Sequence, residues 1–158
     1  MAKFRRRKEG KTNFRQRLKL LLSQKPRVVV RKSLKHMVVQ LVYPGEQGDV
    51  TQLSVISSEL KKFGLNRTGN ISAAYLTGLL FGLRAKKIAK EAVLDIGLQT
   101  SSPGSKIYAT LKGITDAGMS IPHDPVMFPS EERIKNITED LSFEDIKEKM
   151  LSDFTQGE

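Results

Sequence analysis

The sequence predicts a mixed α/β fold, with helices packed on a mixed sheet, on three observations. Three runs rich in β-branched residues follow one another on short connections between residues 27 and 57, which is typical of an antiparallel meander. A long helical pattern over residues 69–90 leads directly into a short apolar run at 92–96, as in half of a βαβ crossover. The total of 158 residues suits one domain, to which a tail is attached.

Positive charge is concentrated at the N-terminus. The formal net charge is +10, but residues 1–35 carry +13, residues 36–123 carry +3 and residues 124–158 carry −6. A basic arm on a nearly neutral globule indicates a polyanionic partner such as nucleic acid. The alternatives are a solvated, disordered tail or a sorting signal.

The first 26 residues are expected to form an arm and a short helix. Residues 1–11 have no apolar periodicity, so we expect disorder in the free protein and order on a phosphate backbone. Thr12 or Asn13 would cap a helix that runs to about Gln24, and Pro26 ends it. One side of this helix carries Phe14, Leu18, Leu21 and Leu22, and Arg15, Arg17 and Lys19 point away from that side.

The meander consists of expected strands at 27–33, 35–43 and 50–57. A tight turn near Ser33 and Leu34 joins the first two, and residues 44–49 form the second turn. In the third strand, Val50, Leu53 and Val55 are expected to point inward.

The central helix of residues 69–90 follows a helical turn at 58–63 and a loop at 64–69. Asn70 or Ser72 would cap it, one face is expected to be buried, and Lys86, Lys87 and Lys90 would lie in its last turn. Gly78 and Gly82 are expected to let it lie close to the sheet. The apolar run at 92–96 that follows is expected to form a strand that is covered on both faces.

The remaining chain continues with a polar loop at 99–106, where ligand contacts of α/β sheets tend to lie. A helix at 107–117 is expected to point Ile107, Leu111 and Ile114 inward and to end at Gly118. One amphipathic helix is expected at 143–151, starting at Ser142. We therefore predict three parts: a disordered basic arm (1–11), an α/β RNA-binding domain that includes the first helix (12–125), and an acidic C-terminal extension (126–158).

Composition excludes several classes of function. The absence of cysteine excludes disulfides and thiol chemistry, and no apolar run approaches the ~18 residues of a membrane span, so a soluble cytosolic protein is expected. Neither a metal site nor a cofactor is predicted. The four acids Asp49, Glu59, Asp95 and Asp116 could suggest a ribonuclease-H-like two-metal nuclease, but only Asp95 falls on a central strand, so catalysis is not expected.

Several segments together resemble one family. They are FRRRKEGKT at 4–12, RQRLKLL at 15–21, RVVVRKS at 27–33, GDV at 48–50, NISAAYLTG at 70–78, LDIGL at 94–98, LKG at 111–113, DAG at 116–118 and IPH at 121–123. In this order they resemble the large-subunit ribosomal protein that binds 5S ribosomal RNA, number eighteen in bacterial and archaeal naming and five in eukaryotic naming. The resemblance covers residues 3–129, and the short length is similar to the archaeal form.

The resemblance implies an α/β domain with a mixed sheet that is not an enzyme, with Asp95 and Asp116 as structural residues. It also implies a cytoplasmic protein of the large ribosomal subunit, where it would help fix 5S ribosomal RNA to 23S ribosomal RNA in the central protuberance beside neighbouring ribosomal proteins. A general RNA chaperone is the alternative. No small-molecule substrate or membrane partner is expected.

The candidate RNA-binding residues are cationic or polar side chains of the arm, the first helix, the first strands and the loops. Phe4 is the candidate for stacking on a base, whereas Phe14 and Tyr75 are expected in the core. The full set is Lys3, Phe4, Arg5, Arg6, Arg7, Lys8, Lys11, Arg15, Arg17, Lys19, Lys25, Arg27, Arg31, Lys32, Lys35, Asn66, Arg67, Asn70, Thr100, Ser101 and Lys106.

Overall fold

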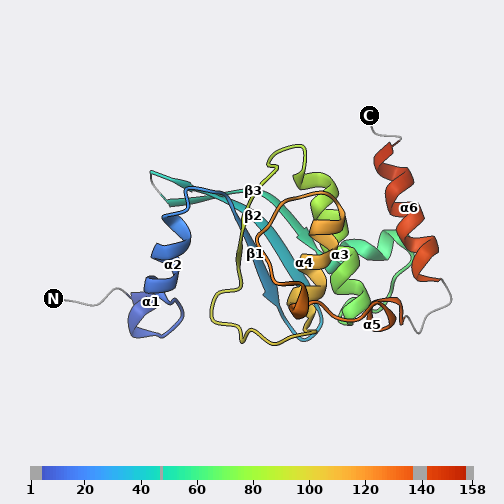
Figure 1. The fold of residues 1–158 in the computed structure, drawn as a ribbon, viewed down its shortest axis with the longest axis horizontal. Helices are drawn as coiled ribbons and strands as arrows, with labels where there is room; N and C mark the ends of the chain where they lie inside the picture. Colours follow the sequence, from blue (N-terminus) through green and yellow to red (C-terminus); the bar gives the residue numbers. More distant parts are fainter. Residues whose placement is uncertain (1–4, 47, 137–141, 156–158) are drawn as a thin grey trace.

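The computed structural model describes residues 5–46, 48–136 and 142–155. Figure 1 shows a sheet with helices α3 and α4 against one of its faces. Its strands are β1 (Arg27–Lys32), β2 (Met37–Gly45), β3 (Gly48–Ile56) and β4 (Val93–Asp95), in the order β3-β2-β1-β4. Strands β1 to β3 form an antiparallel meander and β4 pairs in parallel with β1, so the predicted mixed sheet is confirmed.

The β2–β3 hairpin is longer and tighter than the sequence predicted. Strand β2 continues to Gly45 and β3 begins at Gly48, so most of the expected turn is paired. The register shifts between Leu41 and Val42, which marks a β-bulge in the hairpin. Val55 is fully buried but Val50 is 55% exposed, so the prediction for Val50 was wrong. The reason is that the hairpin extends beyond the layer of helices (Figure 1).

Helix α3 (Ile71–Ala85) lies at the centre of the fold. The Asn70 side chain caps it by accepting a hydrogen bond from the Ala73 amide at 2.7 Å, as predicted. The expectation of a single buried face was wrong, because α3 packs on strands β2 and β3 and also along α4 (Lys106–Asp116), and is buried along almost all of its length. The helix ends at Ala85, so the three lysines at 86, 87 and 90 follow it instead of forming its last turn.

Glycines on α3 and α4 allow these two helices to approach closely. A Cβ atom on Gly78 would overlap the carbonyl oxygen of Thr110, and one on Gly113 would overlap that of Tyr75. A Cβ on Gly82 would lie 2.6 Å from the Cβ of Ala117. The prediction that Gly78 and Gly82 face the sheet was therefore wrong, since their partner is α4.

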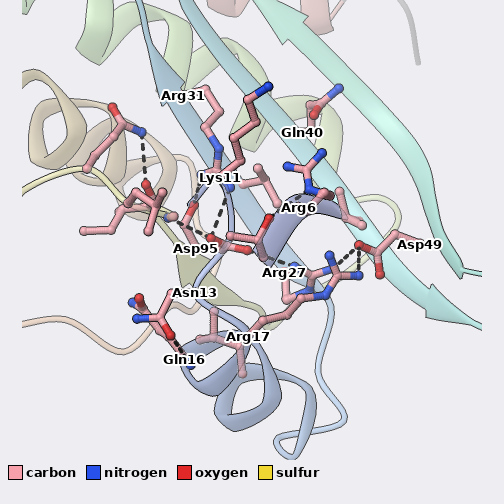
Figure 2. A pocket seen from close by; sticks show the side chains of 18 of the residues that line it. Arg6, Lys11, Asn13, Gln16, Arg17, Arg27, Arg31, Gln40, Asp49 and Asp95 are labelled. Atoms are coloured by element: carbon pink, nitrogen blue, oxygen red, sulfur yellow. Dashed lines mark hydrogen bonds and ion pairs between the residues drawn. The ribbon is translucent and has the colours of Figure 1, made fainter. Parts of the chain in front are cut away.

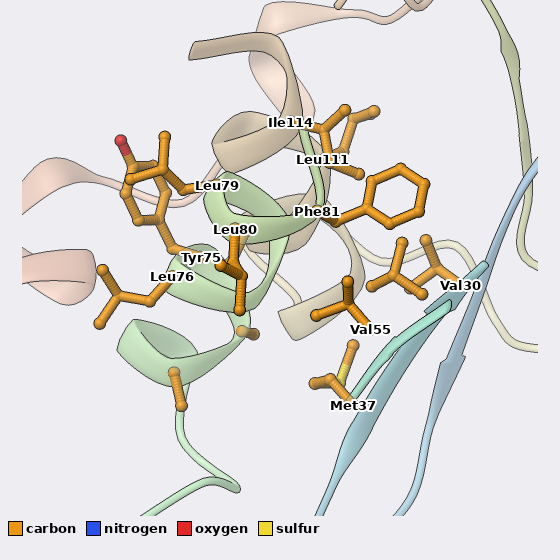
Figure 3. Packing of buried hydrophobic residues seen from close by; sticks show 14 of the residues in the cluster. Val30, Met37, Val55, Tyr75, Leu76, Leu79, Leu80, Phe81, Leu111 and Ile114 are labelled. Atoms are coloured by element: carbon orange, nitrogen blue, oxygen red, sulfur yellow. The ribbon is translucent and has the colours of Figure 1, made fainter. Parts of the chain in front are cut away.

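The core lies between the sheet and the two long helices. Figure 3 shows Leu80 and Phe81 of α3, Leu111 and Ile114 of α4 and Val30 of β1 gathered in this space. Strand β4 was predicted to be covered on both faces, but Val93 and Leu94 are only partly buried. This follows from its position, because β4 is an edge strand of the sheet.

The acidic C-terminal segment completes the same core. The sequence predicted one amphipathic helix there, whereas the structure has the short 3₁₀ turn η2 (Pro125–Met127), α5 (Glu131–Lys135) and a longer α6 (Phe143–Thr155). The helical turn predicted at 58–63, earlier in the chain, is the 3₁₀ helix η1 (Ser57–Phe63). Four side chains from this segment are buried in the main cluster: Ile134, Phe143, Ile146 and Met150. The Phe143 ring lies 5.5 Å from that of Tyr75, so α6 packs against α3.

Candidate nucleic-acid interface

Helix α2 (Phe14–Leu21) lies against the face of the sheet that α3 and α4 leave open. Asn13 caps it, accepting a hydrogen bond from the Gln16 amide at 3.1 Å, as predicted. The sheet-facing side of the helix is mainly polar: Gln16, Arg17 and Leu20 line the space between it and the strands. Figure 2 shows Gln16 and Arg17 in this lining. Arg17 donates from Nη2 to Oδ2 of Asp49 at 2.8 Å. The Arg17 side chain therefore points toward the sheet, although part of it remains exposed to solvent.

Arg27 is the most deeply buried cation of the candidate set. Its side chain is 3% exposed, its Nη1 donates to Oδ2 of Asp95 at 2.8 Å, and its Nη2 lies 2.6 Å from Oδ2 of Asp49. A cation so enclosed by two carboxylates is compensated within the protein. In this arrangement Arg27 holds strands together and is not presented to a ligand.

Arg31 makes contacts within the fold and is also partly exposed to solvent. Its Nη1 donates to the carbonyl oxygens of Val30 at 2.9 Å and Asp95 at 2.8 Å, and its Nη2 lies 3.2 Å from Oδ1 of Asp95. Gly97 donates its amide to the same oxygen at 2.9 Å. The Arg31 side chain is nevertheless 43% exposed, so its outer edge remains accessible beside the arm.

A cavity of about 500 Å³ lies between the N-terminal segment and the open face of the sheet. Figure 2 shows that its cationic lining comes from both sides, with Arg6 and Lys11 from the arm facing Arg31 of β1. Asp49 and Asp95 are the acids of the lining, and both are engaged by arginines. The structure therefore brings five of the predicted cations together here: Arg6, Lys11, Arg17, Arg27 and Arg31.

The arm contains one turn of helix, α1 (Arg5–Lys8), where the sequence predicted no regular structure. Glu9 explains this turn, because it pairs with Arg5 at 3.1 Å and with Lys11 at 2.9 Å. Arg6 donates from Nε to the Thr12 hydroxyl at 2.8 Å. Arg7 and Lys8 are exposed, and Lys3 and Phe4 lie outside the described residues.

A second group of predicted residues lies in a separate hollow of about 560 Å³ near the β1–β2 turn. Lys35, Asn66, Arg67 and Asn70 line it, together with His36 and Lys61, which the sequence did not single out. The Asn70 side-chain oxygen caps α3, so its role there is structural. Lys61 lies on η1, and only the three-dimensional position of that turn brings it to this hollow.

The other candidate residues lie outside both hollows. Lys25 pairs with Glu91 at 2.6 Å, and its hydrogen bond and positive charge lower the pKa of Glu91. Ser101 hydrogen bonds the hydroxyl of Tyr108. Exposed side chains complete the set: Arg15 and Lys19 on α2, Lys32 at the end of β1, and Thr100 in the loop after β4, while Lys106 at the start of α4 is half-buried.

The expectation that Phe14 belongs to the core was wrong, whereas that for Tyr75 is confirmed. Phe14 is 37% exposed and Tyr75 is 4% exposed. The difference arises because α2 turns its polar side to the sheet, which leaves its apolar side outward.

The four acids of the nuclease alternative occupy different environments. Asp49 and Asp95 are bridged by Arg27, Asp116 accepts a hydrogen bond from the Tyr75 hydroxyl at 2.8 Å, and Arg84 pairs with Glu59 at 2.7 Å. Burial acts to raise the pKa of Glu59, but hydrogen bonds from the Ile56 amide and Arg84 outweigh it and lower that pKa. Within the described residues, His, Asp and Glu form no group of three or more that could hold a metal ion.

Within residues 5–46, 48–136 and 142–155, no helix has both the length and the apolar character that crossing a membrane requires.

Comparison with known proteins identifies the family. A family model described as ribosomal large subunit proteins 60S L5, and 50S L18 matches residues 1–90 and 84–124. The large ribosomal subunit protein uL18 of Methanococcoides burtonii is 52% identical over 96% of this chain and 94% of its own length. Those of Methanothrix thermoacetophila (51%; 84% of this chain, 79% of its own length) and Methanococcus maripaludis (54%; 87% and 75%) are similar. The chain therefore belongs to the family of large-subunit ribosomal proteins that comprises 60S L5 and 50S L18.

Proposed function

We propose that this chain binds 5S ribosomal RNA and helps attach it to 23S ribosomal RNA in the central protuberance of the large subunit. The observation that carries the proposal is the distribution of exposed cations on the N-terminal segment. Arg5, Arg7, Lys8 and Lys11 are all exposed on the arm, while Glu9 is the one acid among the first 35 residues. Membership in a large-subunit ribosomal family supports ribosomal RNA as the polyanion.

Binding and placement, without catalysis, are the proposed mode of action. Lysine and arginine side chains neutralise phosphates and release counterions, which supplies affinity but little sequence information. Specificity comes from RNA shape, 2′-hydroxyl groups and unstacked bases. The hollow lined by Lys35, Lys61 and Arg67 is a second proposed contact with RNA, because its lining is cationic. It lies on the folded domain and is separate from the arm.

The test is a competition experiment with purified protein and labelled 5S RNA. We expect transfer RNA in tenfold excess to leave most of the 5S complex intact. Equal displacement by 5S and transfer RNA would instead indicate the general RNA chaperone. The same samples, incubated with Mg²⁺, are expected to show no RNA cleavage, and cleavage that is lost in Asp95→Asn would overturn the proposed mode of action.

A further inference from the structure

Helix α2 turns apolar side chains to solvent. Leu18 is 60% exposed and Leu22, at the end of the helix, is 73% exposed. Residues four apart lie on the same side of a helix, so these two form one patch, which we call the leucine stripe (Leu18 and Leu22). A single exposed apolar side chain is ordinary, and two neighbouring ones on one helix face make a candidate contact surface.

The side of α2 that faces the sheet makes polar contacts, while Leu18 and Leu22 lie on the opposite side. Arg17 reaches Asp49 at 2.8 Å, and Asp49 is in turn held by the buried Arg27 at 2.6 Å. Asn13, Gln16, Arg17 and Leu20 line the cavity over the sheet. As a result, the side of α2 that would ordinarily pack on a core points outward.

Charge and chemistry distinguish between the possible occupants of the leucine stripe. RNA is bound through phosphates and through stacking on aromatic or arginine side chains, and a leucine offers neither charge nor ring. Arg15 lies three residues before Leu18, and Lys19 lies three residues before Leu22, so each cation is a neighbour of one leucine on the helix surface. A second copy of the chain would set these cations against their own kind, which is unfavourable.

We infer that the leucine stripe docks against a neighbouring protein of the large subunit, one that presents an apolar surface with an acidic rim. The apolar centre of such an interface accommodates Leu18 and Leu22, and the acidic rim pairs with Arg15 and Lys19. Arg15 and Lys19, which the sequence analysis counted among the RNA-binding candidates, then pair with protein, and the exposed cations of the arm face RNA. This inference extends the proposed function and depends on the family membership of the chain, not on the choice of RNA.

Hydroxyl-radical footprinting with mass spectrometry tests the inference in three states: free protein, protein with 5S RNA, and assembled large subunits. We expect Leu18 and Leu22 to be oxidised equally fast in the first two states and at least tenfold more slowly in the subunit. Protection that already appears with RNA alone would assign the stripe to RNA. Protection in the free protein that grows with protein concentration would assign the stripe to a second copy of the chain. Leucines that stay reactive in the subunit would show that nothing covers the stripe. Each of these three results overturns the inference.

A matched pair of variants gives a second test. Leu18→Ser combined with Leu22→Ser removes the stripe, and Val126→Ser changes a side chain that is equally exposed, at 77%, but distant in the chain. Both variants are expected to keep the wild-type unfolding midpoint and to bind isolated 5S RNA within twofold of wild type. In competition with wild-type chain, the double variant is expected to be depleted at least fivefold from assembled subunits and Val126→Ser to be incorporated normally.

Equal incorporation of the double variant, or loss of its affinity for isolated RNA, would overturn the inference. Failure of the wild-type chain to bind 5S RNA would count against the proposed function alone, because the comparison of free protein with assembled subunit does not use the RNA complex.

Discussion

Arg27 donates a hydrogen bond from Nη1 to Oδ2 of Asp95 at 2.8 Å, across 68 positions of the sequence. The bond joins β1 to β4 at a point where the arginine side chain is 3% exposed. The same guanidinium lies 2.6 Å from Asp49 at the start of β3. One cation thus connects three strands, and the charge that remains for RNA resides on the arm and around the β1–β2 turn.

Asp95→Asn is expected to lower the free energy of unfolding by about 3 kcal/mol, because it leaves a buried arginine with one carboxylate fewer. Urea denaturation measures the loss. Glu148→Gln, an exposed acid on α6, serves as control and should change stability by no more than about 0.5 kcal/mol. A loss below about 1 kcal/mol for Asp95→Asn would mean that the ion pair is not a structural requirement.

Gly78→Ala is expected to destabilise the protein by about 2 kcal/mol, because the added methyl group overlaps the Thr110 carbonyl of α4. Helix propensity alone predicts the opposite, a gain of about 1 kcal/mol on replacing a helical glycine by alanine. The sign of the change in unfolding free energy therefore decides between close helix packing and propensity.

Local chemistry predicted much of this fold. Asn13 and Asn70, the caps of α2 and α3, were each one of two residues predicted for that role, because a side chain that accepts from a first-turn amide acts over three residues. The meander and the inward positions of Ile107, Leu111 and Ile114 on α4 followed from periodicity and turn signals, and all three side chains are fully buried.

Long-range contacts account for what the sequence could not predict. The outward face of α2 depends on the pairing of Arg17 with Asp49, 32 positions away, and periodicity alone carries no information on it. Likewise, the sequence marks Arg27 as a cation but not as a buried one, since its two acidic partners come from other strands. Lys61 and His36 join Arg67 only through the tertiary fold.

Ile146→Ala is expected to cost about 3 kcal/mol in unfolding free energy, because Ile146 is fully buried in the main core. This would make α6 part of a single cooperative unit with the α/β domain and not a separate extension. Val126→Ala, at an exposed position, is the control and should have an effect of no more than about 0.5 kcal/mol. Urea unfolding in two separate steps, with only the first affected, would argue for an independent C-terminal part.

Tyr75 is expected to make the protein less stable in alkali. Burial, and then its hydrogen bond to Asp116, raise the pKa of Tyr75 well above its ordinary value. The folded state therefore holds the phenolic proton more tightly than the unfolded chain, whose tyrosine pKa is about 10. The contribution of this group is fully present below about pH 10 and is lost as the pH rises further.

Urea midpoints at pH 9 and pH 11 measure this effect. At pH 9 we expect Tyr75→Phe to be less stable than wild type, because the variant lacks the hydrogen bond to Asp116. Between pH 9 and pH 11 we expect the variant to lose less stability than wild type. An identical loss in both proteins would show that other groups cause the alkaline sensitivity.

The salt dependence of 5S RNA binding, measured for the full chain and for residues 12–158, tests most directly whether the N-terminal arm supplies the electrostatic affinity. Residues 1–11 contain six lysines and arginines, and each phosphate contact contributes about 0.7 to 0.9 to the slope of log affinity against log salt. If half of them contact phosphate, the truncation should flatten the slope by about 2 to 3 units.

The truncated chain should remain folded, because the deletion removes no residue of the core cluster. A full-length variant with glutamine at these six positions should match the truncated chain, which separates charge from length. An unchanged slope in both would contradict the proposal and place the RNA contact on the folded domain.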